Sequence, residues 1–87
     1  MSVTVELTYD MSKALGVRRF DVDGARTVED VIRLTRERFG ERGEAFAQLT
    51  RVAGVVVNGV LVSHRRGMGT PLAEGDTVTF VKAAAGG

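Results

Sequence analysis

The sequence lacks cysteine and contains one proline and one histidine among its 87 residues. Without cysteine, the chain has no disulfide framework, no thiolate metal site and no cysteine nucleophile. The net charge of +1 argues against a protein that binds nucleic acid or a membrane surface through bulk charge. No apolar run approaches the roughly 20 residues of a membrane span, and no basic stretch followed by an apolar one suggests a signal peptide. These absences predict a single cytoplasmic domain, large enough to form a core without disulfides or metals.

The first part of the chain predicts a β-hairpin. Residues 3–9 alternate strictly between apolar and polar side chains, which is the period of a half-buried strand. Residues 17–23 predict a second strand, with Phe20 and Val22 on one face. Between the two strands, residues 10–16 are expected to form a connecting loop.

The apolar side chains that follow are at helical spacing. Thr27 is suited to cap the N-terminus of a helix, and acidic residues follow in the first turn, where the helix dipole favours negative charge. Gly40 is a natural end, so the segment between them predicts an amphipathic helix that packs against a sheet. Residues 41–51 leave two interpretations open. Phe46 and Leu49 could anchor a short second helix, but the charges around them would also suit a loop.

The second half of the chain predicts another hairpin and a final strand. Asn58-Gly59 stands between two β-branched runs in residues 55–62, and both turn positions need residues that tolerate positive φ. Residues 70–72, Thr-Pro-Leu, predict a single capped helical turn with proline at its first position. Residues 75–82 predict a turn followed by a strand.

The order of these elements predicts an α+β fold. One main helix would pack across a mixed sheet of about five strands, giving a two-layer arrangement. With the first and last strands central and parallel, this is the β-grasp, or ubiquitin-like, fold.

The sequence ends in Ala-Ala-Ala-Gly-Gly, directly after the expected last strand. We therefore expect a β-grasp domain at residues 1–82 and a flexible tail at residues 83–87. Such a tail spans at most about 17 Å when extended. Glycine has no Cβ and adopts backbone angles that other residues avoid, so the end of the tail is thin enough to enter another protein's site. A disordered terminus without a function is the alternative.

Several short motifs occur in an order that is typical of one family. The chain resembles the sulfur-carrier family of ubiquitin-like β-grasp proteins, which includes the small subunit of molybdopterin synthase and the sulfur carrier of thiamin biosynthesis. The extra segment at residues 41–51 is more similar to the molybdopterin-synthase type. Lys82 and Ala83 depart from the tails of that type, which often carry prolines there, so the pathway stays open. The motifs that carry the resemblance are Val57-Asn58-Gly59-Val60-Leu61-Val62-Ser63, Pro71-Leu72, Gly75-Asp76 with Val78 and Phe80, and Gly86-Gly87.

The resemblance implies a carrier and not an enzyme. In this family an E1-like adenylating enzyme joins the C-terminal carboxylate to AMP from ATP, and sulfur then displaces AMP to leave a thiocarboxylate. The reacting carbonyl would belong to Gly87, with Gly86 beside it and Ala85 contacting the partner. No cofactor or metal is expected on the chain itself. The implied second partner is the large subunit of molybdopterin synthase or another sulfur-accepting synthase. Thiamin, cysteine and secondary-metabolite synthesis therefore stay open as alternative pathways.

Leu61 and Val81 are the expected docking residues. If Val60, Val62 and Phe80 face the core, these two apolar side chains point outward from neighbouring strands close to the tail. The corresponding positions of the resembled family serve docking. A solitary exposed apolar pair is the alternative interpretation.

Two other classes of function stay open beside the carrier. One is a ubiquitin-like modifier that is joined through Gly87 to lysines of target proteins. The other is a plain β-grasp interaction module that makes no use of Gly86 and Gly87. Deleting both glycines would separate the last class from the others, because an interaction module would lose nothing.

Overall fold

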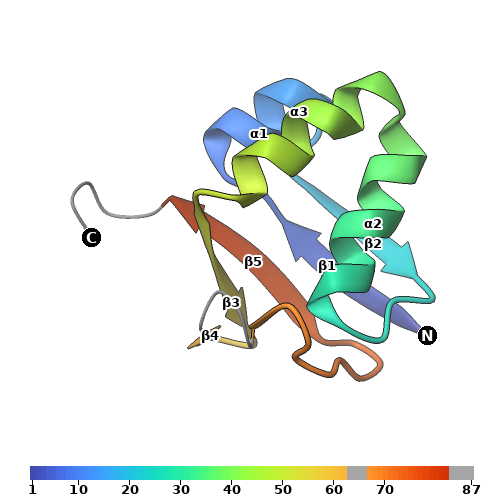
Figure 1. The fold of residues 1–87 in the computed structure, drawn as a ribbon. Helices are drawn as coiled ribbons and strands as arrows, with labels where there is room; N and C mark the ends of the chain where they lie inside the picture. Colours follow the sequence, from blue (N-terminus) through green and yellow to red (C-terminus); the bar gives the residue numbers. More distant parts are fainter. Residues whose placement is uncertain (63–66, 83–87) are drawn as a thin grey trace.

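The computed structural model describes residues 1–62 and 67–82, which form a five-stranded sheet with three helices on one face (Figure 1). This is the two-layer α+β arrangement expected from the sequence. The strands are β1 (Ser2–Glu6), β2 (Arg19–Asp23), β3 (Ala53–Val57), β4 (Val60–Val62) and β5 (Thr77–Lys82), and the helices are α1 (Tyr9–Leu15), α2 (Val28–Phe39) and α3 (Glu41–Thr50).

The sheet is mixed, with the strand order β2-β1-β5-β3-β4. Strands β1 and β5 run parallel, with Val5 opposite Val78, whereas all the other neighbouring strands run antiparallel. The first and last strands therefore lie side by side in the interior of the sheet. This is the β-grasp topology that the sequence predicted.

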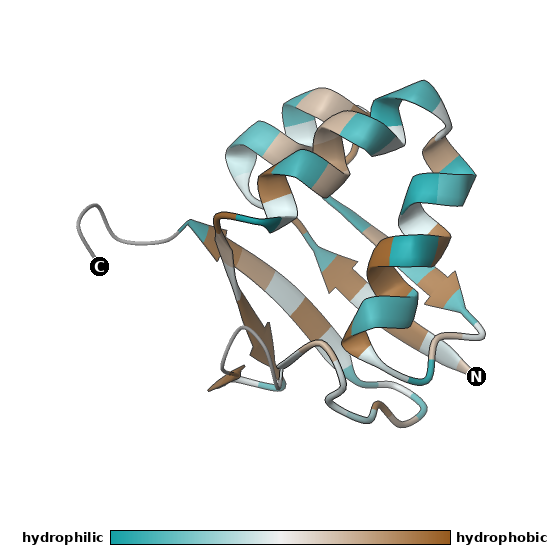
Figure 2. Ribbon diagram, in the orientation of Figure 1, coloured by the Kyte–Doolittle hydropathy of each residue, from teal (hydrophilic) through white to brown (hydrophobic). Residues whose placement is uncertain are grey.

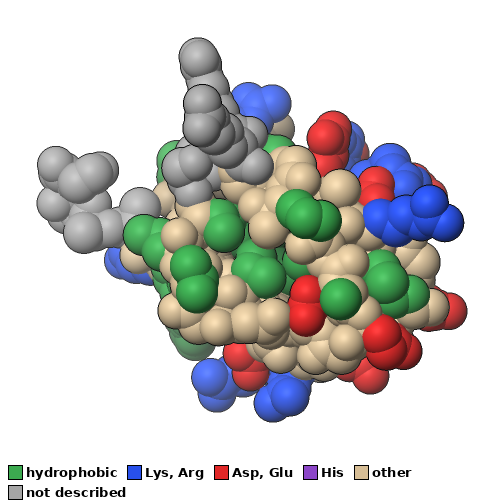
Figure 3. All heavy atoms as spheres, turned by 90° about the horizontal axis from the view of Figure 1, so that it is seen from below, with side chains coloured by type: hydrophobic (Ala, Val, Ile, Leu, Met, Phe, Trp, Pro, Cys, Tyr) green, Lys and Arg blue, Asp and Glu red, His purple; other side chains and the backbone are tan. Residues whose placement is uncertain are grey.

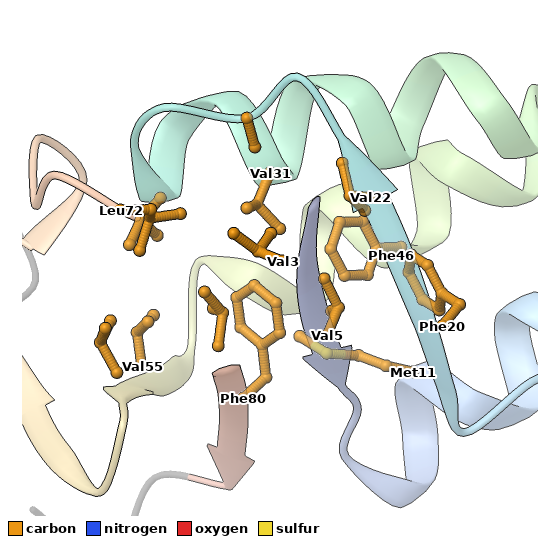
Figure 4. Packing of buried hydrophobic residues seen from close by; sticks show 14 of the residues in the cluster. Val3, Val5, Met11, Phe20, Val22, Val31, Phe46, Val55, Leu72 and Phe80 are labelled. Carbon is orange, nitrogen blue, oxygen red and sulfur yellow. The ribbon is translucent and has the colours of Figure 1, made fainter. Parts of the chain in front are cut away.

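The hydrophobic core lies between the sheet and the helices (Figure 2). Figure 4 shows Phe46 from α3 and Phe80 from β5 in the middle of the core, near Val5 and Met11. The rings of Phe46 and Phe80 pack edge to face, with centroids 5.5 Å apart. Such a pair contributes about 0.5–1.5 kcal/mol beyond the burial of its surface. The helical layer is thereby joined directly to the central strand β5.

The prediction of a loop at residues 10–16 is wrong, because the chain forms helix α1 there. The Thr8 hydroxyl oxygen accepts a hydrogen bond from the Met11 backbone N–H at 3.1 Å, and Gly16 ends the helix with a φ of 76°. Met11 and Leu15 lie one turn apart and are both buried. A helix this short is marginal in isolation, so burial against the core is what stabilises it.

Helix α2 begins and ends where the sequence predicted. The Thr27 hydroxyl oxygen accepts a hydrogen bond from the Asp30 backbone N–H at 3.2 Å, and Gly40 follows the last turn. Val28 and Val31 are buried against the sheet layer. The amphipathic pattern therefore gave both the helix and its buried face.

Of the two interpretations of residues 41–51, a short helix or a loop, the structure has the helix, α3, which buries Phe46. Gly43 allows α3 to pass close to α2: a Cβ at this position would lie 2.5 Å from the Arg36 carbonyl oxygen. A side chain there would push the two helices apart, which makes Gly43 a packing residue.

The Asn58-Gly59 turn joins β3 to β4 as predicted, with φ of 49° and 83° at the two residues. Val60, expected to face the core, is instead 64% exposed. Strand β4 is the outermost strand of the sheet and lies beyond the helical layer, so nothing in the described part of the chain covers this side chain (Figure 1). Val62, at the other end of β4, is half-buried against the core as expected.

The helical turn predicted at residues 70–72 does not form. Pro71 makes an isolated antiparallel bridge with Thr27, and the Leu72 backbone N–H donates to the Arg26 carbonyl oxygen at 2.8 Å. The Leu72 side chain is buried in the core. The partner of this segment is thus the chain before α2, which is distant in sequence.

Candidate functional site

The candidate site surrounds the end of β5, because residues 83–87 follow that strand. Val78 and Phe80 point into the core, whereas Val81 is half-buried on the opposite face. Strand pairing with β1 on one side and β3 on the other fixes the direction of β5. The chain therefore leaves the sheet at Lys82 from a firmly held strand.

The predicted tail residues Ala85, Gly86 and Gly87 lie outside the described residues, and so do residues 63–66. The roles assigned to the three tail residues stay predictions. The described part of the site consists of the surfaces on either side of the end of β5.

The first of these surfaces is on the outer face of the sheet, away from the helices. Val81 pairs with Gly54 and Leu61 pairs with Val56, which places all four residues on one face. The Leu61 side chain is 68% exposed, as expected, whereas Val81 is only half-exposed because it packs over Gly54. We call the surface formed by Gly54, Val56, Leu61 and Val81 the outer patch.

The outer patch brings the two predicted docking residues together. The point where a Gly54 Cβ would stand is 2.9 Å from Val81 Cγ2 and 3.6 Å from Leu61 Cδ1. The missing side chain of Gly54 therefore lets Val81 and Leu61 approach each other across β3. Figure 3 views the molecule from below and shows hydrophobic side chains on this face, with charged side chains mostly around the rim.

The second surface is an apolar groove of about 570 Å³ on the other side of the end of β5. It lies between the start of α1, the end of α3 and the last residues of β5. The sequence pattern does not indicate this groove, because it predicts a loop at residues 10–16, where helix α1 forms. The signal was present in Thr8 and Gly16, which cap the two ends of α1. The groove is lined chiefly by Tyr9, Leu49, Val52, Phe80, Val81 and Lys82.

A hydrogen-bond network fixes the opposite end of β5. Asp76 accepts hydrogen bonds from the Ala73 backbone N–H at 2.7 Å and from the Asn58 side-chain amide at 2.9 Å. The Asn58 side-chain oxygen in turn accepts from the Thr77 backbone N–H at 2.9 Å. The Ala73 N–H, followed by the Asn58 amide, holds the pKa of the Asp76 carboxyl below its ordinary value, because both donors favour the charged form. The β3–β4 hairpin turn is thereby tied to the start of β5.

The charged side chains Asp30, Arg33 and Glu37 of α2 pair with one another. The Arg26 backbone N–H is the main cause that lowers the pKa of Asp30, and Arg33 adds to it. Arg33 also lies 3.2 Å from Glu37, and the two acidic partners raise its pKa. These exposed pairs stabilise α2 only slightly.

Within residues 1–62 and 67–82, no three His, Asp or Glu side chains are grouped so that they could hold a metal ion. In the same part of the chain, every helix is too short or too polar to cross a bilayer. What the described residues offer at the end of β5 is apolar contact surface on both sides of a rigid strand.

Comparison with known protein families places these features in context. The model of the ThiS family matches residues 11–87, which is most of the chain. The chain belongs to the ThiS family. Members of this family are small ubiquitin-like sulfur-carrier proteins. No curated protein sequence matches the chain at a significant level.

Solved structures similar to this ThiS-family protein have the same fold. SAMP1, a small archaeal modifier protein from Haloferax volcanii, is 26% identical with a TM-score of 0.66, and the match covers 100% of both chains. CysO of Mycobacterium tuberculosis is 22% identical with a TM-score of 0.75, covering 94% of this chain and 99% of that one. A complex of subunits 1 and 2 of the molybdopterin-converting factor from Helicobacter pylori contains a chain that is 20% identical, with a TM-score of 0.68 and 100% coverage of both chains.

Proposed function

We propose that this ThiS-family protein carries sulfur as a thiocarboxylate at Gly87. The observation that carries the proposal is the family match, which runs through residue 87 and so includes Gly86-Gly87. A carboxylate is a poor electrophile, so the Gly87 carboxylate first attacks the α-phosphate of ATP, which forms an acyl-adenylate and releases pyrophosphate. Sulfur at the oxidation level of sulfide then attacks the Gly87 carbonyl carbon, and AMP leaves. ATP is used by the activating enzyme, and this chain is its substrate.

Two partners follow from this chemistry. An E1-like adenylating enzyme activates Gly87, and a sulfur-accepting synthase takes the sulfur from it. The Helicobacter pylori complex supports a synthase partner, because its molybdopterin-converting factor subunit 1 is bound to subunit 2. We assign the outer patch, with Leu61 and Val81, to the docking of these partners, and Ala85 to the contact around the tail. The reaction uses cellular ATP, so we place the protein in the cytoplasm.

The first candidate pathway is molybdopterin synthesis. The likeness to the molybdopterin-converting factor subunit supports it, and helix α3 fills the segment that suggested this type from the sequence. Thiamin, cysteine and secondary-metabolite synthesis are the alternatives. Adding the thiolated protein to the large subunit of molybdopterin synthase and its pterin precursor tests the first pathway directly, since molybdopterin is then the product.

A second candidate is a protein modifier joined through Gly87 to lysines of target proteins. The match to the archaeal modifier SAMP1, at 26% identity over the whole chain, favours it. The activated Gly87 carbonyl is the same in both cases, and only the nucleophile differs. Mass spectrometry of cellular conjugates tests this candidate, since a modifier leaves Gly-Gly remnants on target lysines after proteolysis.

The sulfur-carrier proposal is tested by the intact mass of the protein after incubation with its adenylating enzyme, ATP and a sulfur donor. The expected product gains the mass of one oxygen-to-sulfur exchange, located at Gly87. Adding one residue after Gly87 is expected to abolish the product, because the carboxylate is moved from the reactive position. Gly86→Val is also expected to abolish it, because a β-branched side chain crowds the backbone of a thin tail. Equal thiolation of the extended protein would overturn the proposal.

A further inference from the structure

The apolar groove beside β5 exposes large side chains that do not serve the core. Of the five large hydrophobic residues exposed in the described part of the chain, Tyr9 at 74% and Val52 at 69% have the largest exposed fractions. Both line the same groove, although Tyr9 belongs to α1 and Val52 follows α3. Exposed apolar side chains that converge from separate elements indicate a contact surface.

The groove lies where any enzyme that uses Gly87 must approach. Lys82 lines the groove, and Gly87 is five residues further along the chain. Five extended residues span at most about 17 Å. An enzyme that holds Gly87 in its active site therefore has its own surface within that distance of the groove.

The lining of the groove selects an uncharged occupant. It contains one acidic residue, Asp10, and one basic residue, Lys82, so it has no net charge with which to attract a charged group. Leu49, Val52 and Phe80 provide apolar wall. Burying a charge against such a wall would be costly, whereas an apolar side chain would gain from it.

The groove is continuous with the outer patch. Val81 lines the groove and also packs over Gly54 in the outer patch. The two surfaces therefore share this residue and meet at it. A protein that covers Leu61 and Val81 reaches the groove by passing around the end of β5.

We propose that the groove receives an apolar side chain, aliphatic or aromatic, from the enzyme that activates Gly87. That enzyme would then hold the end of β5 from two sides, by the outer patch and by the groove. This inference rests on the proposed function and adds to it a second docking surface, centred on Val52.

The test measures binding of the purified adenylating enzyme from the same genome by titration calorimetry. Val52→Asp places a carboxylate in the groove, and we expect it to weaken binding about tenfold, as for a central interface residue. Val52→Ile keeps the apolar character and should bind like the parent. Gln48→Glu is the matched control: it also adds one negative charge, but Gln48 lines a different groove, between α2 and α3. We expect its dissociation constant to be unchanged, and circular dichroism checks the fold of each variant.

A dissociation constant of Val52→Asp within about twofold of the parent would overturn the inference, and so would an equal loss in Gln48→Glu. The proposed function has its own readout, because thiolation of the parent protein at Gly87 is measured by mass. A parent that is thiolated, together with a Val52→Asp variant that binds normally, removes the groove from the interface and leaves the sulfur carrier intact. A parent that is neither bound nor thiolated overturns both proposals.

Discussion

Val81 packs directly over Gly54 of the neighbouring strand, with its Cγ2 2.9 Å from the point where a Gly54 Cβ would stand. Replacing Gly54 with alanine therefore has two opposed effects. Loss of a glycine reduces the entropy of the unfolded chain and stabilises by about 0.4–1 kcal/mol. The clash forces the stiff, β-branched Val81 away from its position and costs about 1–3 kcal/mol. We expect Gly54→Ala to lower the free energy of unfolding by about 1 kcal/mol.

Urea denaturation of a double-mutant cycle checks this prediction. Val81→Ala removes the atom that clashes, so Gly54→Ala should be neutral or stabilising in that background. The destabilisation by Gly54→Ala should thus disappear or change sign in the Val81→Ala background. Equal destabilisation in both would show that Val81 is not what limits space at Gly54.

Thr35 and Thr50 form a matched pair of buried threonines. The Thr35 hydroxyl is fully buried in α2 and has no hydrogen-bond partner among the residues described, whereas the Thr50 hydroxyl donates to the Ala47 carbonyl oxygen at 2.6 Å. An unsatisfied buried hydroxyl costs about 1–3 kcal/mol. We expect Thr35→Val to raise the free energy of unfolding by about 1 kcal/mol and Thr50→Val to lower it by about the same amount. Thermal denaturation measures both, and a destabilised Thr35→Val would mean that its hydroxyl is satisfied.

Strong local signals were sufficient to predict helix α2 and the β3–β4 turn, whereas the prediction failed where distant contacts decide the local structure. Helix α2 has a cap, a first turn with acidic residues and an apolar stripe, so its pattern alone was sufficient. Helix α1 has only Met11 and Leu15 as buried residues, too few for the periodicity to stand out. At residues 70–72 the local capping pattern was misleading, because Pro71 is held by a bridge to Thr27, far away in the chain.

The candidate site could be predicted only in part for the same reason. Alternation along β5 and the Asn58-Gly59 turn were enough to place Leu61 on the exposed face. The half-burial of Val81 depends on its pairing with Gly54, which requires the strand order. The apolar groove depends on three elements that meet only in the folded chain, and one of them was the missed helix α1.

The Asp76 network predicts how stability depends on pH. The pKa of Asp76 is lowered from 3.8 in the folded protein, so below that value the unfolded chain binds more protons than the folded one. The contribution of the network is therefore fully present above about pH 4 and is lost as the pH falls through the folded-state pKa. Asp76→Asn should lower stability at neutral pH and give a shallower loss of stability as the pH falls below about 4. Urea denaturation across this range measures it, and parallel curves for parent and variant would assign the acid sensitivity to other groups such as Asp30.

Leu61→Asp separates docking from folding. The Leu61 side chain is 68% exposed on the outer patch, so a carboxylate there costs little stability, and the melting temperature should stay close to that of the parent. Charging an apolar interface residue commonly weakens binding about tenfold or more, so we expect that loss in affinity for the adenylating enzyme.

Val60→Asp is the control. Val60 is the preceding residue, is 64% exposed and points to the opposite face of β4, so the same charge is added without touching the outer patch. Titration calorimetry of the two variants measures their affinity for the adenylating enzyme. An equal loss of affinity in both would mean that a charge near β4 weakens binding regardless of the face it is on. An unfolded Leu61→Asp variant would mean that the Leu61 side chain supports the core.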